Sequence, residues 1–189
     1  MVKFYEEGFD PDDLNIRVSE LLVATADASD ELIDRAVTDM LVLLKERMQM
    51  DVVFVSEFVG DKRVFRYVDG PVNQPVVQVG ESELLERTWC QRVVDGRLPG
   101  VIANVSQYAD KDKLPPTAFD VGTYLSTPVL LKDGHVYGTL CCLSFSPQAI
   151  VQERDLKNLK SVAQLVAKKI DRSQTSDKSA AVTFNLVPK

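Results

Sequence analysis

The sequence is poor in the residues from which most catalytic and metal centres are built. It holds one histidine and three cysteines in 189 residues. Cys141 and Cys142 are adjacent and Cys90 stands alone, which is not the ligand spacing of a zinc site. The sequence also lacks a glycine-rich nucleotide loop and the GxSxG motif of a nucleophile elbow. We therefore expect no metal site, no catalytic residues and no enzymatic activity, and we expect His135 to be an exposed turn residue.

An excess of positive charge and long apolar runs are missing as well. The formal net charge is −6, which argues against a general binder of nucleic acid or of anionic membranes. No run approaches the roughly 20 apolar residues that a membrane helix needs. The acidic residues 1–13 do not resemble a signal peptide, and so few cysteines do not suggest a secreted disulfide framework. These observations favour a cytoplasmic protein.

Two kinds of apolar pattern alternate along the chain. Apolar residues three or four positions apart mark helices, and short runs rich in valine and phenylalanine mark strands. The predicted elements are a helix over 30–48, strands over 51–58 and 62–68, a helix over 83–95 that Ser82 caps and Gly96 terminates, a polar loop over 106–119, strands over 122–131 and 136–145, and a helix over 152–171. Asp133-Gly134 is typical of a tight hairpin turn. The order is not the regular βαβ alternation of a parallel sheet, so it predicts an α+β fold with a central antiparallel sheet.

The chain divides into three segments by pattern. Residues 1–29 are expected to form an N-terminal arm with a short amphipathic helix over 14–24. Residues 30–172 hold the predicted helices and strands and are expected to form one domain. Residues 173–189, rich at first in Ser, Thr, Lys and Ala, are expected to be a C-terminal tail.

The helix over 30–48 has more apolar residues than one stripe requires. Leu32, Ala36 and Leu43 lie outside that stripe, and surplus apolar surface usually marks an interface. The pattern therefore predicts a homodimer built on the helices 30–48 and 152–171, with 14–24 as a possible addition.

Four segments of the chain form a set that occurs in this order in one known family. They are DVVFVSEF at 51–58, WCQRVVDGRLPGVIANV at 89–105, VGTYLSTPVLL at 121–131 and DGHVYGTLCCLS at 133–144. Together they resemble GAF domains, small-molecule sensing modules of signalling proteins, over about residues 30–172. The segment at 89–105 is most similar to GAF modules that accompany diguanylate cyclase or phosphodiesterase domains in bacterial signalling proteins. This sequence contains no such output domain, so a separate signalling protein is a possible partner.

The resemblance also implies an architecture and a binding site. The first and last helices pack on one face of the sheet, and the intermediate helix and loops cover a ligand pocket on the other face. Residues two apart on a strand share a face, and the implied pocket side of 51–58 is that of Phe54. The ligand-binding residues implied in this way are Phe54, Ser56, Phe58, Trp89, Tyr124, Ser126, Thr139 and Cys141. Their mixture of rings and hydroxyls suits a small-molecule site, whereas a collapsed core with satisfied hydroxyls is the alternative.

Three known ligand motifs of the family are missing. The loop over 103–120 has no cysteine, although GAF enzymes that reduce free methionine sulfoxide and bilin-binding GAF photoreceptors carry one there. The Asn-Lys pair of GAF domains that bind cyclic nucleotides is also missing. We expect no bilin and no other cofactor.

The leading hypothesis is a non-catalytic sensory or regulatory module that binds an unidentified small molecule and acts through helix-mediated dimers. One alternative is a structural dimerisation module without a ligand. Another is a thiol-based redox enzyme or switch that uses Cys90 and Cys141. Cys141 and Cys142 must point to opposite faces of their strand, so Cys90 can approach Cys141 only if its helix covers the Cys141 face.

Overall fold

The computed structural model describes residues 30–71, 73, 76–147, 151 and 153–184. The elements in chain order are α2 (Asp30–Arg47), β1 (Val52–Val59), β2 (Lys62–Asp69), β3 (Ser82–Leu84), α3 (Trp89–Val94), β4 (Val101–Ile102), β5 (Thr123–Leu130), β6 (Val136–Ser144) and α4 (Glu153–Phe184). Short 3-10 turns occur at Leu85–Arg87, Val105–Gln107 and Lys111–Lys113. The helix predicted over 14–24 lies outside the described residues. No described helix is both long and apolar enough to cross a membrane.

The strands form one antiparallel sheet with the order β3-β2-β1-β6-β5-β4. The long strands β1, β6 and β5 are central, and the two short strands lie at the edges. The α+β class and the antiparallel sheet predicted from the sequence are confirmed.

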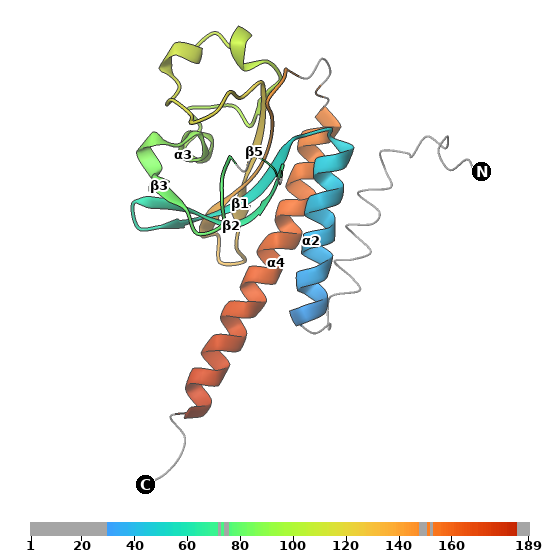
Figure 1. The fold of residues 1–189 in the computed structure, drawn as a ribbon. Helices are drawn as coiled ribbons and strands as arrows, with labels where there is room; N and C mark the ends of the chain where they lie inside the picture. Colours follow the sequence, from blue (N-terminus) through green and yellow to red (C-terminus); the bar gives the residue numbers. More distant parts are fainter. Residues whose placement is uncertain (1–29, 72, 74–75, 148–150, 152, 185–189) are drawn as a thin grey trace, which may run out of the picture.

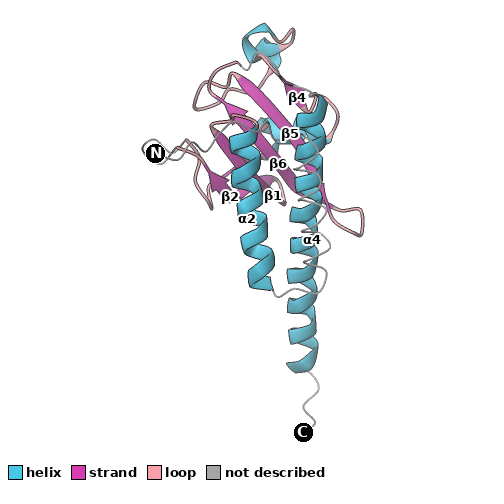
Figure 2. Ribbon diagram, turned by 90° about the vertical axis from the view of Figure 1, so that its right-hand side faces the viewer, coloured by secondary structure: helices cyan, strands magenta, loops and turns pink. Residues whose placement is uncertain are grey.

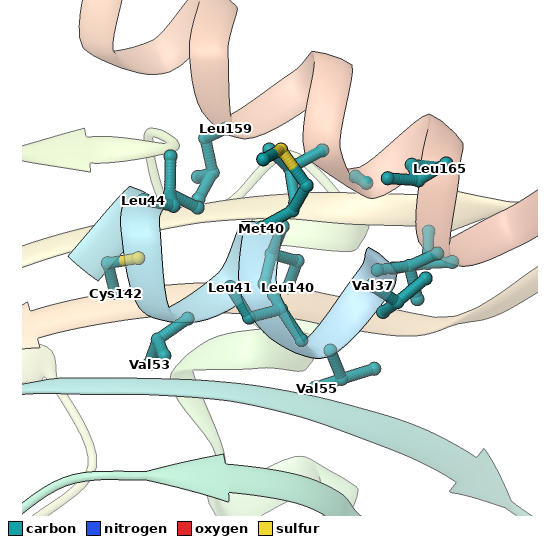
Figure 3. Close-up of a cluster of buried hydrophobic side chains, with 14 of the residues drawn as sticks. Val37, Met40, Leu41, Leu44, Val53, Val55, Leu140, Cys142, Leu159 and Leu165 are labelled. Carbon is teal, nitrogen blue, oxygen red and sulfur yellow. The ribbon is translucent and has the colours of Figure 1, made fainter. Parts of the chain in front are cut away.

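The helices α2 and α4 lie side by side on one face of the sheet (Figure 2). The apolar stripe of α2 faces inward, with Leu41 and Leu44 fully buried. These side chains pack against sheet residues such as Val53 and Leu140 and against Leu159 of α4 (Figure 3). Each such side chain contributes about 1.5–3 kcal/mol when it is fully buried. The predicted position of the first and last helices is confirmed.

The other face of the sheet is covered by α3 and the loops around it, on the side away from α2 and α4 (Figure 1). A second cluster of buried side chains lies there, formed by both the sheet and α3. It includes Phe54, Phe65, Trp89, Tyr124 and Leu143. The sheet therefore separates two cores, and the second one contains the candidate site.

The hairpin between β5 and β6 forms where the sequence predicts it. Gly134 has a φ of 81°, and the backbone N–H of His135 donates to Asp133 Oδ1 at 2.9 Å. His135 is exposed, as expected. Further along β6, Gly138 lies against β1 so closely that a Cβ there would be 1.9 Å from the carbonyl oxygen of Ser56.

The helix predicted over 83–95 is wrong in its first half. Residues Ser82–Leu84 form β3 and pair with β2, where Lys62 lies opposite Leu84. The helix proper is the short α3, and its N-cap is Thr88, whose side chain accepts a hydrogen bond from Gln91 N–H. Pairing with the sheet edge satisfies the backbone groups of Ser82–Leu84 in place of helical hydrogen bonds.

The last helix is longer than predicted. The sequence predicted an end near Asp171 followed by a tail, but α4 continues to Phe184. Residues 173–184 therefore extend the helix instead of belonging to a tail, and α4 reaches beyond the start of α2 (Figures 1 and 2).

Candidate functional site

A cavity of about 380 Å³ lies between the sheet, α3 and the segment before β5. Its inner wall is built from buried side chains of β1, β2, β5, β6 and α3: Phe54, Phe65, Tyr124, Leu143, Trp89 and Cys90. Its rim is exposed and includes Glu81, Ser82, Glu83, Arg87, Pro116, Thr117 and Ala118. The volume is within the range of small-molecule sites.

Aromatic contacts fix the shape of the inner wall. The rings of Phe54 and Phe65 meet edge to face at 4.9 Å, and those of Trp89 and Tyr124 at 5.1 Å. The Trp89 indole N–H donates to the carbonyl of Pro115 at 2.9 Å. This hydrogen bond joins α3 to the loop before β5, which forms another part of the wall, so it holds these two parts of the cavity together.

The structure divides the predicted ligand-binding residues into two groups. Phe54, Trp89 and Tyr124 line the cavity. The described residues that line it do not include Ser56, Phe58, Ser126, Thr139 or Cys141. Phe58 is half-buried and packs against the second core. Binding of a ligand by any of these residues stays a prediction.

The other four predicted residues, Ser56, Ser126, Thr139 and Cys141, form a buried polar layer beside the cavity. Ser56 Oγ and Thr139 Oγ1 are 3.0 Å apart, and Cys141 Sγ and Ser126 Oγ are 3.1 Å apart. These groups satisfy one another inside the core. Ser56, Thr139 and Ser126 therefore fit the alternative expectation, in which the hydroxyls form hydrogen bonds inside the core. Their partners are side chains and not backbone groups.

Arg63 and Phe65 of β2 line the cavity but were not predicted from the sequence. The Arg63 guanidinium lies 4.2 Å from the Phe65 ring centroid and pairs with Glu83 at 3.0 Å. The sequence could have indicated both residues, because they are two apart on one predicted strand and therefore lie on the same face of the sheet. In the β1–β2 register they lie opposite Phe58 and Ser56, which were assigned to that face.

Cys90 and Cys141 meet under α3. Their sulfur atoms are 3.7 Å apart, and the Tyr124 hydroxyl is 3.8 Å from Cys90 Sγ and 3.6 Å from Cys141 Sγ. An Arg63 N–H group donates to Cys90 Sγ at 3.8 Å. The condition set by the sequence, that the helix of Cys90 covers the Cys141 face, is met.

The two thiols have opposite electrostatic environments. The hydrogen bond from Cys141, and then the charge of Arg63, lower the pKa of the Cys90 thiol below its usual value despite burial. Burial is the largest cause that raises the pKa of Cys141, and the adjacent Cys90 raises it further. Cys142 points to the other face, among the residues packed under α2 and α4, and burial raises its pKa. Cys90 is therefore the thiol of the pair that ionises first.

Comparison with known proteins settles the family. The sequence profile of the GAF domain matches residues 33–170. The chain belongs to the GAF domain family. GAF domains are sensory or regulatory modules of signalling proteins, although the fold also occurs in an enzyme. No curated protein matches this GAF domain significantly.

Several solved structures share the fold. The GAF domain of a phosphoenolpyruvate-protein phosphotransferase from Acinetobacter has a TM-score of 0.65 and 16% identity, covering 87% of this chain and 93% of that one. Free methionine-R-sulfoxide reductase from Neisseria meningitidis, in complex with its substrate, has a TM-score of 0.66 and 18% identity, covering 93% and 99%. A putative GAF sensor protein from Burkholderia vietnamiensis has a TM-score of 0.64 and 13% identity, covering 89% and 97%. At these identities the similarity shows the fold of this GAF domain.

Proposed function

We propose that this GAF domain is a non-catalytic sensory or regulatory module that binds a small molecule in the cavity between the sheet and α3. The observation that carries the proposal is the cavity itself, about 380 Å³ in volume with a buried aromatic wall and an exposed polar rim. Small-molecule sites typically combine an apolar wall with a few polar groups that orient the ligand.

The lining favours a ligand with an apolar, ring-bearing body. The rings of Phe54, Trp89 and Tyr124 offer stacking and edge contacts. The charges at the rim have both signs, with Glu81 and Glu83 beside Arg87. The charge of Arg63 is already paired with Glu83, so the cavity is not built around a small anion.

The arrangement of the described residues supports a binding role without catalysis. The single histidine, His135, lies exposed in the β5–β6 turn and is not among the described residues that line the cavity. Free methionine-R-sulfoxide reductase shares the fold, but this sequence has no cysteine over 103–120, where the resemblance implies one for that activity. Among the described residues no group of three or more His, Cys, Asp or Glu side chains is placed to hold a metal ion.

A homodimer through α2 and α4 is the second part of the proposal. Val42 of α2 is half-exposed, and Leu43 is half-buried and packs on the helical core. The side chains of Leu32 and Ala36 lie outside the described residues. The last part of α4 reaches beyond α2 (Figure 2), and most of the stability of a helix in a protein comes from packing of its apolar face. A second copy packed along these helices would supply such packing and a route for output to a separate signalling protein.

The proposed setting is the cytoplasm. All three cysteines are free thiols, as expected in a reducing compartment.

Native mass spectrometry of freshly purified protein tests the ligand proposal. We expect a bound small molecule that dissociates on denaturation. Ala118 is exposed on the cavity rim, so Ala118→Trp would fill the mouth and should remove the bound molecule. Ala109 is exposed in the same covering segment and is not among the described lining residues, so Ala109→Trp should retain it. A bound molecule retained equally by both variants would contradict the assignment of the site.

Light scattering tests the dimer separately. We expect a dimer that Val42→Glu weakens, because a charge would be buried at the contact. A monomer at tens of micromolar would refute the dimer and leave the ligand proposal standing.

A further inference from the structure

Cys90 and Cys141 form a pair of neighbouring thiols at the inner wall of the cavity. Cys90 lines the cavity although the residue is only 1% exposed, whereas Cys141 is fully buried under it. Among the described residues, Cys142 is the remaining free cysteine, and it belongs to the opposite core. The chain therefore places two sulfur atoms 3.7 Å apart, with one of them at the wall of a cavity that small solutes can enter.

Arg63 is held in place beside Cys90, the member of the pair that lines the cavity. Its guanidinium is fixed by Glu83 on one side and by the Phe65 ring on the other, and it donates to Cys90 Sγ. A fixed positive charge beside a sulfur favours the thiolate, which is the nucleophilic form. Burial, and then the hydrogen bond and charge of Cys90, hold the pKa of Cys141 above its usual value, so Cys141 stays a thiol while Cys90 ionises.

We propose that Cys90 and Cys141 form a peroxide-sensitive switch in which Cys90 reacts with hydrogen peroxide in the cavity and Cys141 closes an intramolecular disulfide. This inference does not depend on the identity, or the existence, of the proposed ligand.

The chemistry takes place in two steps. The Cys90 thiolate attacks one peroxide oxygen, the O–O bond breaks, and the released hydroxide takes a proton to become water, leaving Cys90 as a sulfenic acid. The Cys141 sulfur then attacks Cys90 Sγ, the S–O bond breaks, and the departing hydroxide leaves as water with the Cys141 proton. Peroxide is reduced to two water molecules, and the two thiols are oxidised to one disulfide.

The disulfide would connect α3 to β6. The sulfur atoms must approach from 3.7 Å to about 2.05 Å, a movement that α3 can share because it is a short helix between loops. Trp89 precedes Cys90 and is the only tryptophan in the chain. Oxidation therefore alters the wall of the cavity, and it should change the fluorescence of Trp89.

The test is exposure of the reduced full chain to hydrogen peroxide, followed by intact mass measurement and peptide mapping. We expect the mass to fall by two hydrogen atoms, the count of free thiols to fall from three to one, and one cross-linked peptide pair that contains Cys90 and Cys141. Dithiothreitol should reverse all three changes. Three free thiols retained under conditions that oxidise free cysteine, or a disulfide that joins two chains, would overturn the proposal.

Single substitutions assign the two roles. Cys141→Ser should stop the reaction at the sulfenic acid of Cys90, which dimedone traps, and Cys90→Ser should abolish both products. Cys142→Ser is the matched control and should form the disulfide as the unmodified chain does. Dimedone labelling of Cys141 in place of Cys90 would contradict the assignment. Because peptide mapping of the unmodified chain needs no variant, a variant that fails to fold does not prevent the test.

Discussion

The buried hydroxyl pair of Ser56 and Thr139 gives a quantitative test of the polar layer beside the cavity. Both residues are fully buried, and their oxygens are 3.0 Å apart. Among the described residues Thr139 is the hydrogen-bond partner of Ser56 Oγ, whereas Thr139 Oγ1 also lies in hydrogen-bond contact with Cys141 Sγ, 3.4 Å away. Removing either hydroxyl therefore has a different consequence for the one that remains.

We expect Thr139→Val to lower the free energy of unfolding by about 1–3 kcal/mol, because it leaves the Ser56 hydroxyl buried without a partner. Ser56→Ala should cost only about 1 kcal/mol, because Thr139 keeps its contact with Cys141. Replacing both removes the two polar groups together, so the double variant should be less destabilised than the sum of the single variants by at least about 1 kcal/mol.

Urea unfolding followed by Trp89 fluorescence measures these differences, provided that the denaturant dependence is the same for all variants. Additive effects within about 0.5 kcal/mol would refute the direct bond between the two hydroxyls. Loss of a co-purified small molecule in Ser56→Ala, with folding intact, would instead place these hydroxyls at the ligand.

Two other predictions concern β6 and its neighbours. Gly138→Ala should destabilise the fold by more than about 4 kcal/mol, because the new Cβ would lie 1.9 Å from the Ser56 carbonyl oxygen. Gly134→Ala is the control: a Cβ there would have no atom within 4 Å, but the φ of 81° makes the change cost about 1–2 kcal/mol. Equal urea midpoints for the two variants would contradict the close approach of Gly138 to β1. Burial, and then the charge of Glu57, raise the pKa of Tyr137 to about 12, so its stabilising effect is complete below the unfolded value of about 10 and is lost as the pH rises through about 12. Urea midpoints of the unmodified chain should therefore fall more steeply than those of Tyr137→Phe in that interval, and parallel curves would disprove the shift.

Local patterns predicted most of the architecture. The stripe of α2 and the alternation in β1 depend only on residues close in sequence, and both faces of β1 were assigned correctly. The helix predicted over 83–95 failed because the pairing of Ser82–Leu84 with β2 is a long-range contact. A spacing of four between Leu85, Trp89 and Val93 fits a helix equally well, so the sequence did not separate the two possibilities.

The sequence indicated which face of the sheet the candidate site residues occupy, but not which of them line the cavity. Ser56 and Thr139 lie on the face assigned to the pocket, yet they are directly opposite in the register of β1 and β6 and bond to each other. Alternation predicts which side of a sheet a residue occupies, whereas the register decides whether it has a cross-strand partner. For α4, the composition after Asp171 suggested a tail, but no proline or glycine occurs there before Pro188 to end the helix.

The indole resonance of Trp89 tests the proposed ligand site most directly. A protein with one tryptophan gives one indole N–H signal, and this N–H is held by Pro115 at the wall of the cavity. We predict that the signal in freshly purified protein differs from that of the same protein after unfolding, dialysis and refolding, and that adding back the small molecules released on unfolding restores it. An unchanged indole signal, with no small molecule released, would contradict the central proposal that this GAF domain binds a ligand between its sheet and α3.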